Sequence, residues 1–97
     1  MSRHVIHISK KLLAFRGDAI KIKKESENSS SDIIIIDFSE VHFISRAFAD
    51  EFLKISEKLQ KNGVKIQLSN IKPNLKKLFQ TVRSTRKRIK RELSAQE

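Results

Sequence analysis

The chain contains no cysteine, tryptophan or tyrosine, and it has one proline and two glycines among its 97 residues. Without cysteine it can form no disulfide, no thiolate zinc site and no thiol nucleophile. Any aromatic surface that stacks on single-stranded nucleic acid would have to come from the six phenylalanines. No apolar run approaches the roughly 20 residues that cross a bilayer, and no signal-peptide pattern opens the sequence. We therefore expect one small cytoplasmic domain.

The net charge of +10 is concentrated toward the C-terminal end. Nine basic and no acidic residues lie between Lys72 and Arg91, whereas residues 1–71 carry twelve basic and nine acidic side chains. A run of one sign is typical of segments that bind phosphates, acidic proteins or anionic lipid, and a solvated helix end is the alternative. The candidate anion or nucleic-acid contacts are Arg83, Arg86, Lys87, Arg88, Lys90 and Arg91.

Residues 33–36 are four consecutive isoleucines. An unbroken β-branched run favours a strand covered on both faces, as in the middle of an α/β sheet. Further strands are predicted over 3–8 and 64–68, and helices over 46–61 and from Pro73 onward.

Residues 9–28 fit a helix or a hairpin equally well, and we expect a helix over 16–27. The order β-α-β-α-β-α predicts an α/β fold with a small, mostly parallel sheet. We divide the chain into a domain over 1–82 and a basic C-terminal helix extension or tail over 83–97.

The start of the helix over 46–61 is the candidate working surface. Ser45 is a preferred N-cap residue, and Asp50 and Glu51 place negative charge in the early turns. Partners of open α/β sheets dock beyond the carboxyl ends of central strands. We therefore expect partner contacts from Ser45, Arg46, Asp50 and Glu51, within a surface that runs from Ile44 to Glu51 and includes the loop at 69–72.

The residues IIIIDFSEVHFIS over 33–45 are similar to the central strand and following loop of STAS domains, the fold of anti-sigma factor antagonists. The residues SRAFADEF over 45–52 resemble more closely a STAS-like subfamily of unassigned function, which carries Ser-Arg-x-Phe-Ala-Asp-Glu-Phe. The resemblance covers roughly residues 30–82. It implies a non-enzymatic regulatory module that docks other proteins, with a histidine-kinase-like ATPase as a candidate partner.

One departure from that family bears on regulation. Antagonist-type STAS domains carry Asp-Ser-Ser/Thr-Gly in this loop, and a partner kinase phosphorylates the second hydroxyl residue. Aligned here, Ala47 stands at the phosphorylated position and cannot accept phosphate. Ser45 is the neighbouring hydroxyl and a candidate phosphosite, where a helix N-terminus and Arg46 favour phosphate. The alternative role for Ser45 is that of a plain N-cap.

No catalytic or metal-binding set is complete in the sequence. Asp37 and Asp50 form a candidate carboxylate pair, but no further acid, base or glycine-rich phosphate loop accompanies them. His4 and His7 fall on opposite faces of a strand. We therefore predict no enzyme activity, no cofactor and no metal. Two functions stay open: a protein-interaction module, and a sequence-tolerant nucleic-acid-binding accessory protein that uses the basic C-terminal helix.

Overall fold

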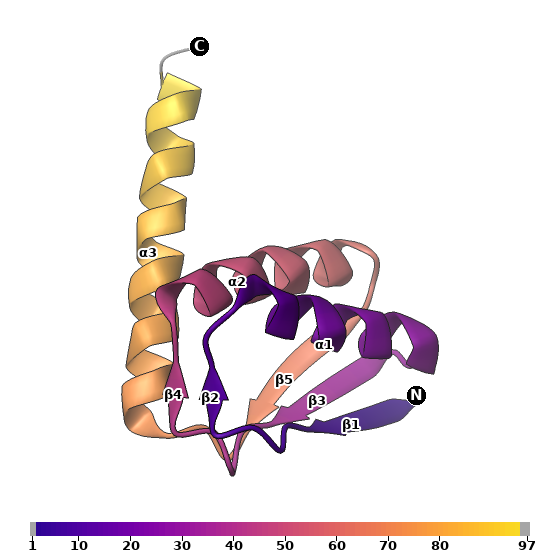
Figure 1. The fold of residues 1–97 in the computed structure, drawn as a ribbon. Coiled ribbons are helices and arrows are strands. Elements are labelled where there is room, and N and C mark those ends of the chain that lie inside the picture. The colour runs from indigo at the N-terminus through magenta and orange to yellow at the C-terminus, as the bar shows by residue number, and fades with distance from the viewer. Residues whose placement is uncertain (1, 96–97) are drawn as a thin grey trace.

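The computed structural model describes the backbone of residues 2–95 and the side chains of residues 2–86 (Figure 1). It has an α/β fold with a small parallel sheet, as the sequence predicts. The elements in chain order are β1 (Arg3–His7), β2 (Leu12–Leu13), α1 (Arg16–Ser29), β3 (Ile33–Asp37), β4 (Phe43–Ile44), α2 (Arg46–Lys61), β5 (Lys65–Ser69) and α3 (Pro73–Ala95).

The main sheet has the order β1-β3-β5, with every strand parallel to its neighbour. The isoleucine run forms the central strand, where Ile36 pairs with Ile6 of β1 and with Leu68 of β5. A strand in this position hydrogen-bonds on both sides, and β-branched side chains suit its pleated surface. The central strand therefore fixes the position of everything that follows its carboxyl end.

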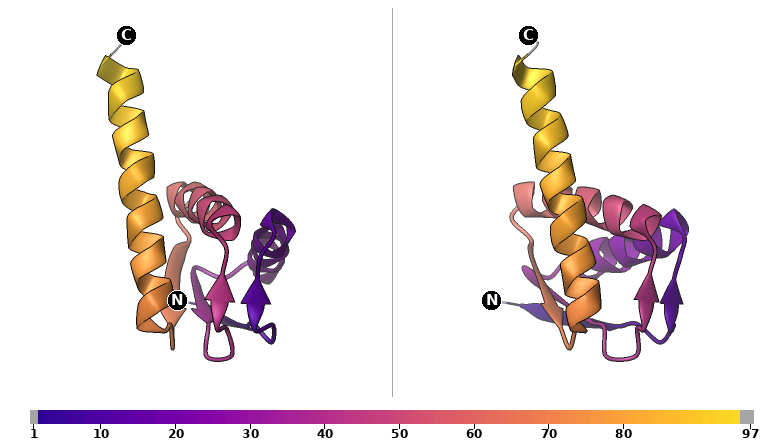
Figure 2. Two further views of the ribbon diagram at one scale, coloured as in Figure 1. Left: turned by 60° about the vertical axis from the view of Figure 1, so that its left-hand side comes forward. Right: turned by 90° about the vertical axis from the view of Figure 1, so that its left-hand side faces the viewer.

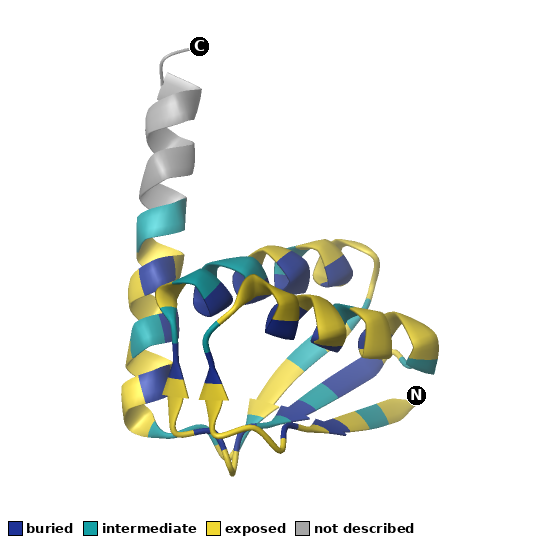
Figure 3. Cartoon of the chain, in the orientation of Figure 1, coloured by how far each residue is buried: buried dark blue, intermediate teal, exposed yellow. Residues whose placement is uncertain are grey.

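Helices α1 and α2 lie side by side over one face of this sheet (Figure 1). Ile34 and Ile36 project into the core under these helices, whereas Ile33 and Ile35 alternate to the other face and lie outside the core cluster. On that other face Val5 is 58% exposed and Gln67 is also exposed (Figure 3). We expected the central strand to be covered on both faces, but helices cover only one. The flanking strands β1 and β5 together with this single helical layer are enough to shelter the isoleucine run.

The structure contains two short strands that the sequence patterns do not predict. β2 and β4 pair in parallel, with Leu12 opposite Phe43 and Leu13 opposite Ile44. Each lies in the connection between a strand of the main sheet and the helix that follows it (Figure 1). Two residues are too few for hydrophobic periodicity to reveal. Leu13 and Ile44 are buried, so this ladder closes the core at the end where α1 and α2 begin.

Residues 16–29 form a helix, which settles the choice between helix and hairpin. The side chain of Asp18 accepts a hydrogen bond from the backbone N–H of Phe15 at 3.3 Å and caps the first turn. Ala19, Ile22 and Ser26 are buried at helical spacing toward the core. Capping and this narrow stripe favour the helix over the alternating pattern within the same residues.

Helix α2 begins and ends as the sequence predicts. Gly63 follows it with φ of +87°, a left-handed conformation that glycine adopts without steric cost. Helix α3 packs beside α2 (Figure 2) through Leu75, Phe79 and Val82, all of which are buried. It continues without a break to Ala95, so the boundary after residue 82 falls inside a helix and stays a prediction.

The phenylalanine cluster beneath α2 and α3 gives the first testable prediction. Phe38 is fully buried and meets Phe52 and Phe79 edge to face at 6.3 and 6.0 Å. We expect Phe38→Ala to lower the free energy of unfolding by about 3–5 kcal/mol in urea denaturation, because it leaves a cavity. Val5→Ala, at an exposed site, is the control and should change stability by less than about 0.5 kcal/mol. Equal effects of the two substitutions would contradict this packing.

Candidate functional site

Ser45 joins the two strand-to-helix connections. Its backbone N–H donates to the carbonyl of Leu13 at 2.9 Å, and its Oγ donates to the carbonyl of Ala14 at 2.6 Å. The same Oγ accepts a hydrogen bond from the backbone N–H of Phe48 at 3.0 Å. The N-cap role is therefore present, and it is combined with a bridge to the start of α1. Phosphorylation of Ser45 stays a prediction, and it would require the loss of the hydroxyl's bond to Ala14.

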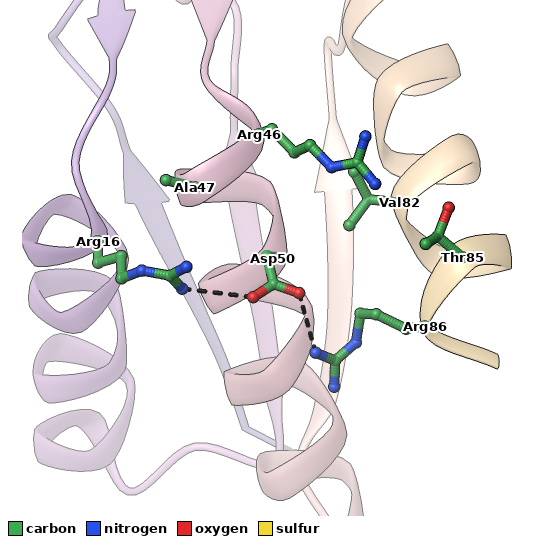
Figure 4. A pocket seen from close by; sticks show the side chains of 7 residues that line it. All are labelled: Arg16, Arg46, Ala47, Asp50, Val82, Thr85 and Arg86. Carbon is green, nitrogen blue, oxygen red and sulfur yellow. Dashed lines mark hydrogen bonds and ion pairs between the residues drawn. The ribbon is translucent and has the colours of Figure 1, made fainter. Parts of the chain in front are cut away.

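An ion-pair network crosses the three helices near the start of α2. Asp50 accepts hydrogen bonds from Arg16 of α1 at 3.3 Å and from Arg86 of α3 at 3.1 Å (Figure 4). Arg16 also contacts Glu51 at 3.3 Å, and Arg86 contacts Glu57 at 3.2 Å. Partial burial raises the pKa of Asp50, but the hydrogen bonds from Arg86 and Arg16 outweigh it and leave the pKa below its usual value. Asp50 thus links α2 to both α1 and α3 through ion pairs.

A pocket of about 350 Å³ opens beside this network (Figure 4). Its lining comes from α1, α2 and α3 and contains three arginines, one carboxylate, two small apolar side chains and a threonine: Arg16, Arg46, Ala47, Asp50, Val82, Thr85 and Arg86. The guanidinium group of Arg46 extends from α2 toward Val82 and Thr85 of α3 (Figure 4). The pocket therefore combines guanidinium groups with two small apolar side chains, and Arg46 is the arginine of its lining that pairs with no described carboxylate.

The structure brings the four predicted contact residues to one end of α2 but gives them different tasks. Ser45 is a structural bridge, and Asp50 and Glu51 pair with basic side chains of the same chain. Arg46 is exposed and makes no hydrogen bond or ion pair with any residue whose side chain is described. Arg46 is thus the member of the predicted set whose charge is available to a partner.

The predicted basic contacts divide in a similar way. Arg83 is exposed, whereas Arg86 is largely buried and pairs with Asp50 and Glu57. The side chains of Lys87, Arg88, Lys90 and Arg91 lie outside the part of the chain whose side chains are described. Sequence reasoning missed the internal role of Arg86, although this arginine interrupts the apolar stripe of α3 one turn after Val82. A charge on a core-facing stripe needs a partner.

Three exposed apolar side chains lie in the two connections that lead into α1 and α2. Leu12 is 51% exposed, Phe43 is 56% exposed and Phe15 is 74% exposed. Leu12 and Phe43 are paired across the β2–β4 ladder. Phe15 is the residue after Ala14, whose carbonyl accepts the hydrogen bond from the hydroxyl of Ser45. These three residues, which we call the apolar rim, were not identified from the sequence because they lie in short connections without periodicity.

A second polar cluster lies at the carboxyl ends of β1 and β3. His7 contacts Asp37 at 2.9 Å through Nδ1 and contacts Glu40 through Nε2. Asp37 also accepts hydrogen bonds from Asn70 at 3.1 Å and from the backbone N–H of Ser39 at 2.9 Å. The hydrogen bonds with Asp37 and Glu40 raise the pKa of His7, and those from His7 and Asn70 hold the pKa of Asp37 well below its usual value.

The candidate carboxylate pair does not form one site, because Asp37 and Asp50 belong to these two separate clusters. Among the described residues no group of three or more histidine, aspartate or glutamate side chains is placed to hold a metal ion. Within the same residues no helix is long and apolar enough to cross a membrane.

The comparison with known families identifies the fold class. The STAS-domain family matches residues 3–93, and the chain belongs to this family. STAS domains are generally non-enzymatic modules that mediate protein–protein interaction and regulation. No curated protein and no solved structure matches the chain. The family resemblance of the segment over 30–82 is thus confirmed, and the match extends into the last helix.

The His7 cluster predicts how stability depends on pH. Because its pKa is raised, His7 contributes fully to the free energy of unfolding below about pH 6.5. This contribution is lost as pH rises through the raised pKa. The contribution of Asp37 is present above about pH 3.8 and is lost as pH falls through its lowered pKa. Raising the pH from about 6 to about 9 should therefore destabilise the native chain in urea unfolding.

The control for this prediction is a second exposed histidine. His7→Gln should remove most of that pH dependence, whereas His42→Gln should leave it unchanged. A His7→Gln chain that still loses stability over the same pH interval would show that other groups cause the effect.

Proposed function

We propose that this STAS domain is a regulatory module that docks a partner protein on the surface around the start of α2, from Ile44 to Glu51. The apolar rim of Leu12, Phe15 and Phe43 is the single observation that supports this surface most strongly. Large apolar side chains grouped beside a charged residue are typical of contact sites, where aromatic and arginine side chains supply much of the binding energy.

The rigidity of this region also supports the proposal. Both connections that carry the rim are held by the β2–β4 pairing and by the hydrogen bonds of Ser45 to Leu13 and Ala14. Below them Ile44 and Phe48 are fully buried. A surface that is already ordered loses little conformational entropy when a partner binds. Arg46, which pairs with none of the described side chains, adds positive charge near this surface and favours an acidic or polar contact on the partner.

The proposal predicts which substitutions abolish partner binding. Affinity capture from the native cell extract should recover one or more proteins with the wild-type chain and lose the same proteins with Phe43→Ser or Arg46→Glu. Val5→Ser is the matched control, because Val5 has an exposure of 58%, close to that of Phe43, but lies on the open face of the main sheet. Truncating a central contact typically costs more than about 1 kcal/mol of binding free energy. Unchanged recovery with both Phe43→Ser and Arg46→Glu, or equal loss with Val5→Ser, would argue against this surface.

A sequence-tolerant nucleic-acid-binding role for α3 is the second candidate. It is supported by the length of α3, which runs as one helix to Ala95 through the basic run, and by the exposure of Arg83. Arg86 is a poor candidate for phosphate contact in this role, because Asp50 and Glu57 already occupy its guanidinium group.

The pairing of Arg86 decides how this second role is tested. Removing residues 87–97 keeps Val82 and Arg86, on which the packing of α3 against the body depends. If α3 binds nucleic acid, the full chain should shift a random single-stranded oligonucleotide at low salt, and the truncated chain should bind more weakly with a shallower salt dependence. Equal binding by the two chains, or no binding by the full chain at low salt, would exclude the role.

A further inference from the structure

We propose that the pocket beside Asp50 binds a phosphomonoester, carried on a phosphorylated side chain of the docked partner. This inference rests on the proposed docking function and names the chemical group that the docking surface would recognise. The pocket lies directly beside the predicted contact residues, because Arg46, Ala47 and Asp50 belong both to its lining and to the start of α2.

The composition of the lining favours an oxyanion. Three guanidinium groups, from Arg16, Arg46 and Arg86, line the pocket beside one carboxylate, that of Asp50. Glu51 and Glu57 pair with Arg16 and Arg86 from outside the lining, so Arg46 supplies the charge that no described carboxylate balances. The three guanidinium groups reach the pocket from three different helices, so they can approach a tetrahedral group from several sides. Guanidinium groups form short, charge-assisted hydrogen bonds with phosphate oxygens and can present two parallel donors to them.

Unused donors remain in the lining. Arg46 has no hydrogen bond or ion pair with any residue whose side chain is described. Arg86 uses its two terminal nitrogens for Asp50 and Glu57, and its Nε, which has no partner in the same part of the chain, is buried beyond the reach of a ligand. Arg16 bonds its acidic neighbours through one nitrogen, at 3.3 Å in both cases. Arg46 and the remaining nitrogens of Arg16 can therefore donate to a ligand while the ion pairs of Asp50 stay in place.

The size and the apolar part of the pocket favour a phosphorylated side chain over a bare ion. Its volume of about 350 Å³ lies near the lower limit for small-ligand sites, which is roughly 300 Å³. Ala47 and Val82 provide apolar walls for the carbon stem that carries the phosphate. In Figure 4 Ala47 and Val82 lie on different sides of the pocket, with Ala47 on α2 and Val82 on α3.

The test uses the full ¹⁵N-labelled chain and a capped tripeptide of alanine, phosphoserine and alanine, followed by amide chemical shifts. We expect saturable shifts in residues 46–50 and 82–86, and no such shifts with the unphosphorylated tripeptide. Arg46→Gln should weaken the affinity roughly tenfold, as expected for the loss of a hydrogen bond from a charged donor. Because Arg46 is exposed and pairs with none of the described side chains, this variant should keep a native spectrum.

Arg83→Gln is the matched control. Arg83 is an exposed arginine of α3 outside this pocket, and its replacement removes the same charge. Unchanged affinity in this variant supports the pocket, whereas equal weakening by the two variants would reduce the effect to general attraction by a basic chain and overturn the proposal. Inorganic phosphate that binds as tightly as the phosphorylated tripeptide would overturn the assignment to a partner's side chain.

Failure of this proposal can be separated from failure of the docking function. A chain that does not bind the phosphorylated tripeptide, yet loses its captured partner through Phe43→Ser, retains the docking function and overturns the phosphate site. A chain that binds the tripeptide and loses no partner through Phe43→Ser keeps the phosphate site as a pocket, and it overturns both the docking surface and the partner-borne source of the phosphate.

Discussion

The hydrogen bonds of Ser45 hold together the two connections that lead into α1 and α2. Its backbone and its hydroxyl bind consecutive carbonyls, those of Leu13 and Ala14, and the hydroxyl also caps α2. The carboxyl ends of parallel strands lie at the same edge of a sheet, so the helices that follow them begin near that edge. This arrangement alone does not fix the relative positions of the two helix starts. The bridge through Ser45 does so, and it brings Arg16 within reach of Asp50 and Glu51. The pocket beside Asp50 and the apolar rim both depend on that placement.

The parts of the fold that the sequence predicts are those with long, repeated patterns. The run over 33–36 and the stripe over 46–61 each combine several residues into one signal, so their identity as strand and helix is clear. Coverage of the second sheet face could not be decided from the same run, because a central strand flanked on both sides already favours β-branched residues. The β2–β4 ladder could not be predicted because each of its strands has only two residues, which is too short to show hydrophobic periodicity.

The candidate site was predictable by position but not by pairing. Residues 45–51 follow the central strand, and general rules for α/β sheets direct attention there. The partners of Asp50 come from Arg16 and Arg86, which are 34 and 36 residues away in the sequence. No local pattern specifies such a pair. The interruption of the α3 stripe by Arg86 was the one available signal, because a core-facing charge implies a counter-charge on the neighbouring helix.

The net charge of +10 acquires a different meaning once these pairs are known. Arg16 and Arg86 neutralise carboxylates within the chain and contribute to the docking of α1 and α3 onto α2. Partly buried pairs of this kind position elements more than they stabilise them, since the cost of desolvation offsets much of the attraction. Positioning matters here because Arg46 has no such partner among the residues whose side chains are described. It lines a pocket whose other arginines are held by ion pairs, so a ligand that engages Arg46 meets a surface that needs little rearrangement.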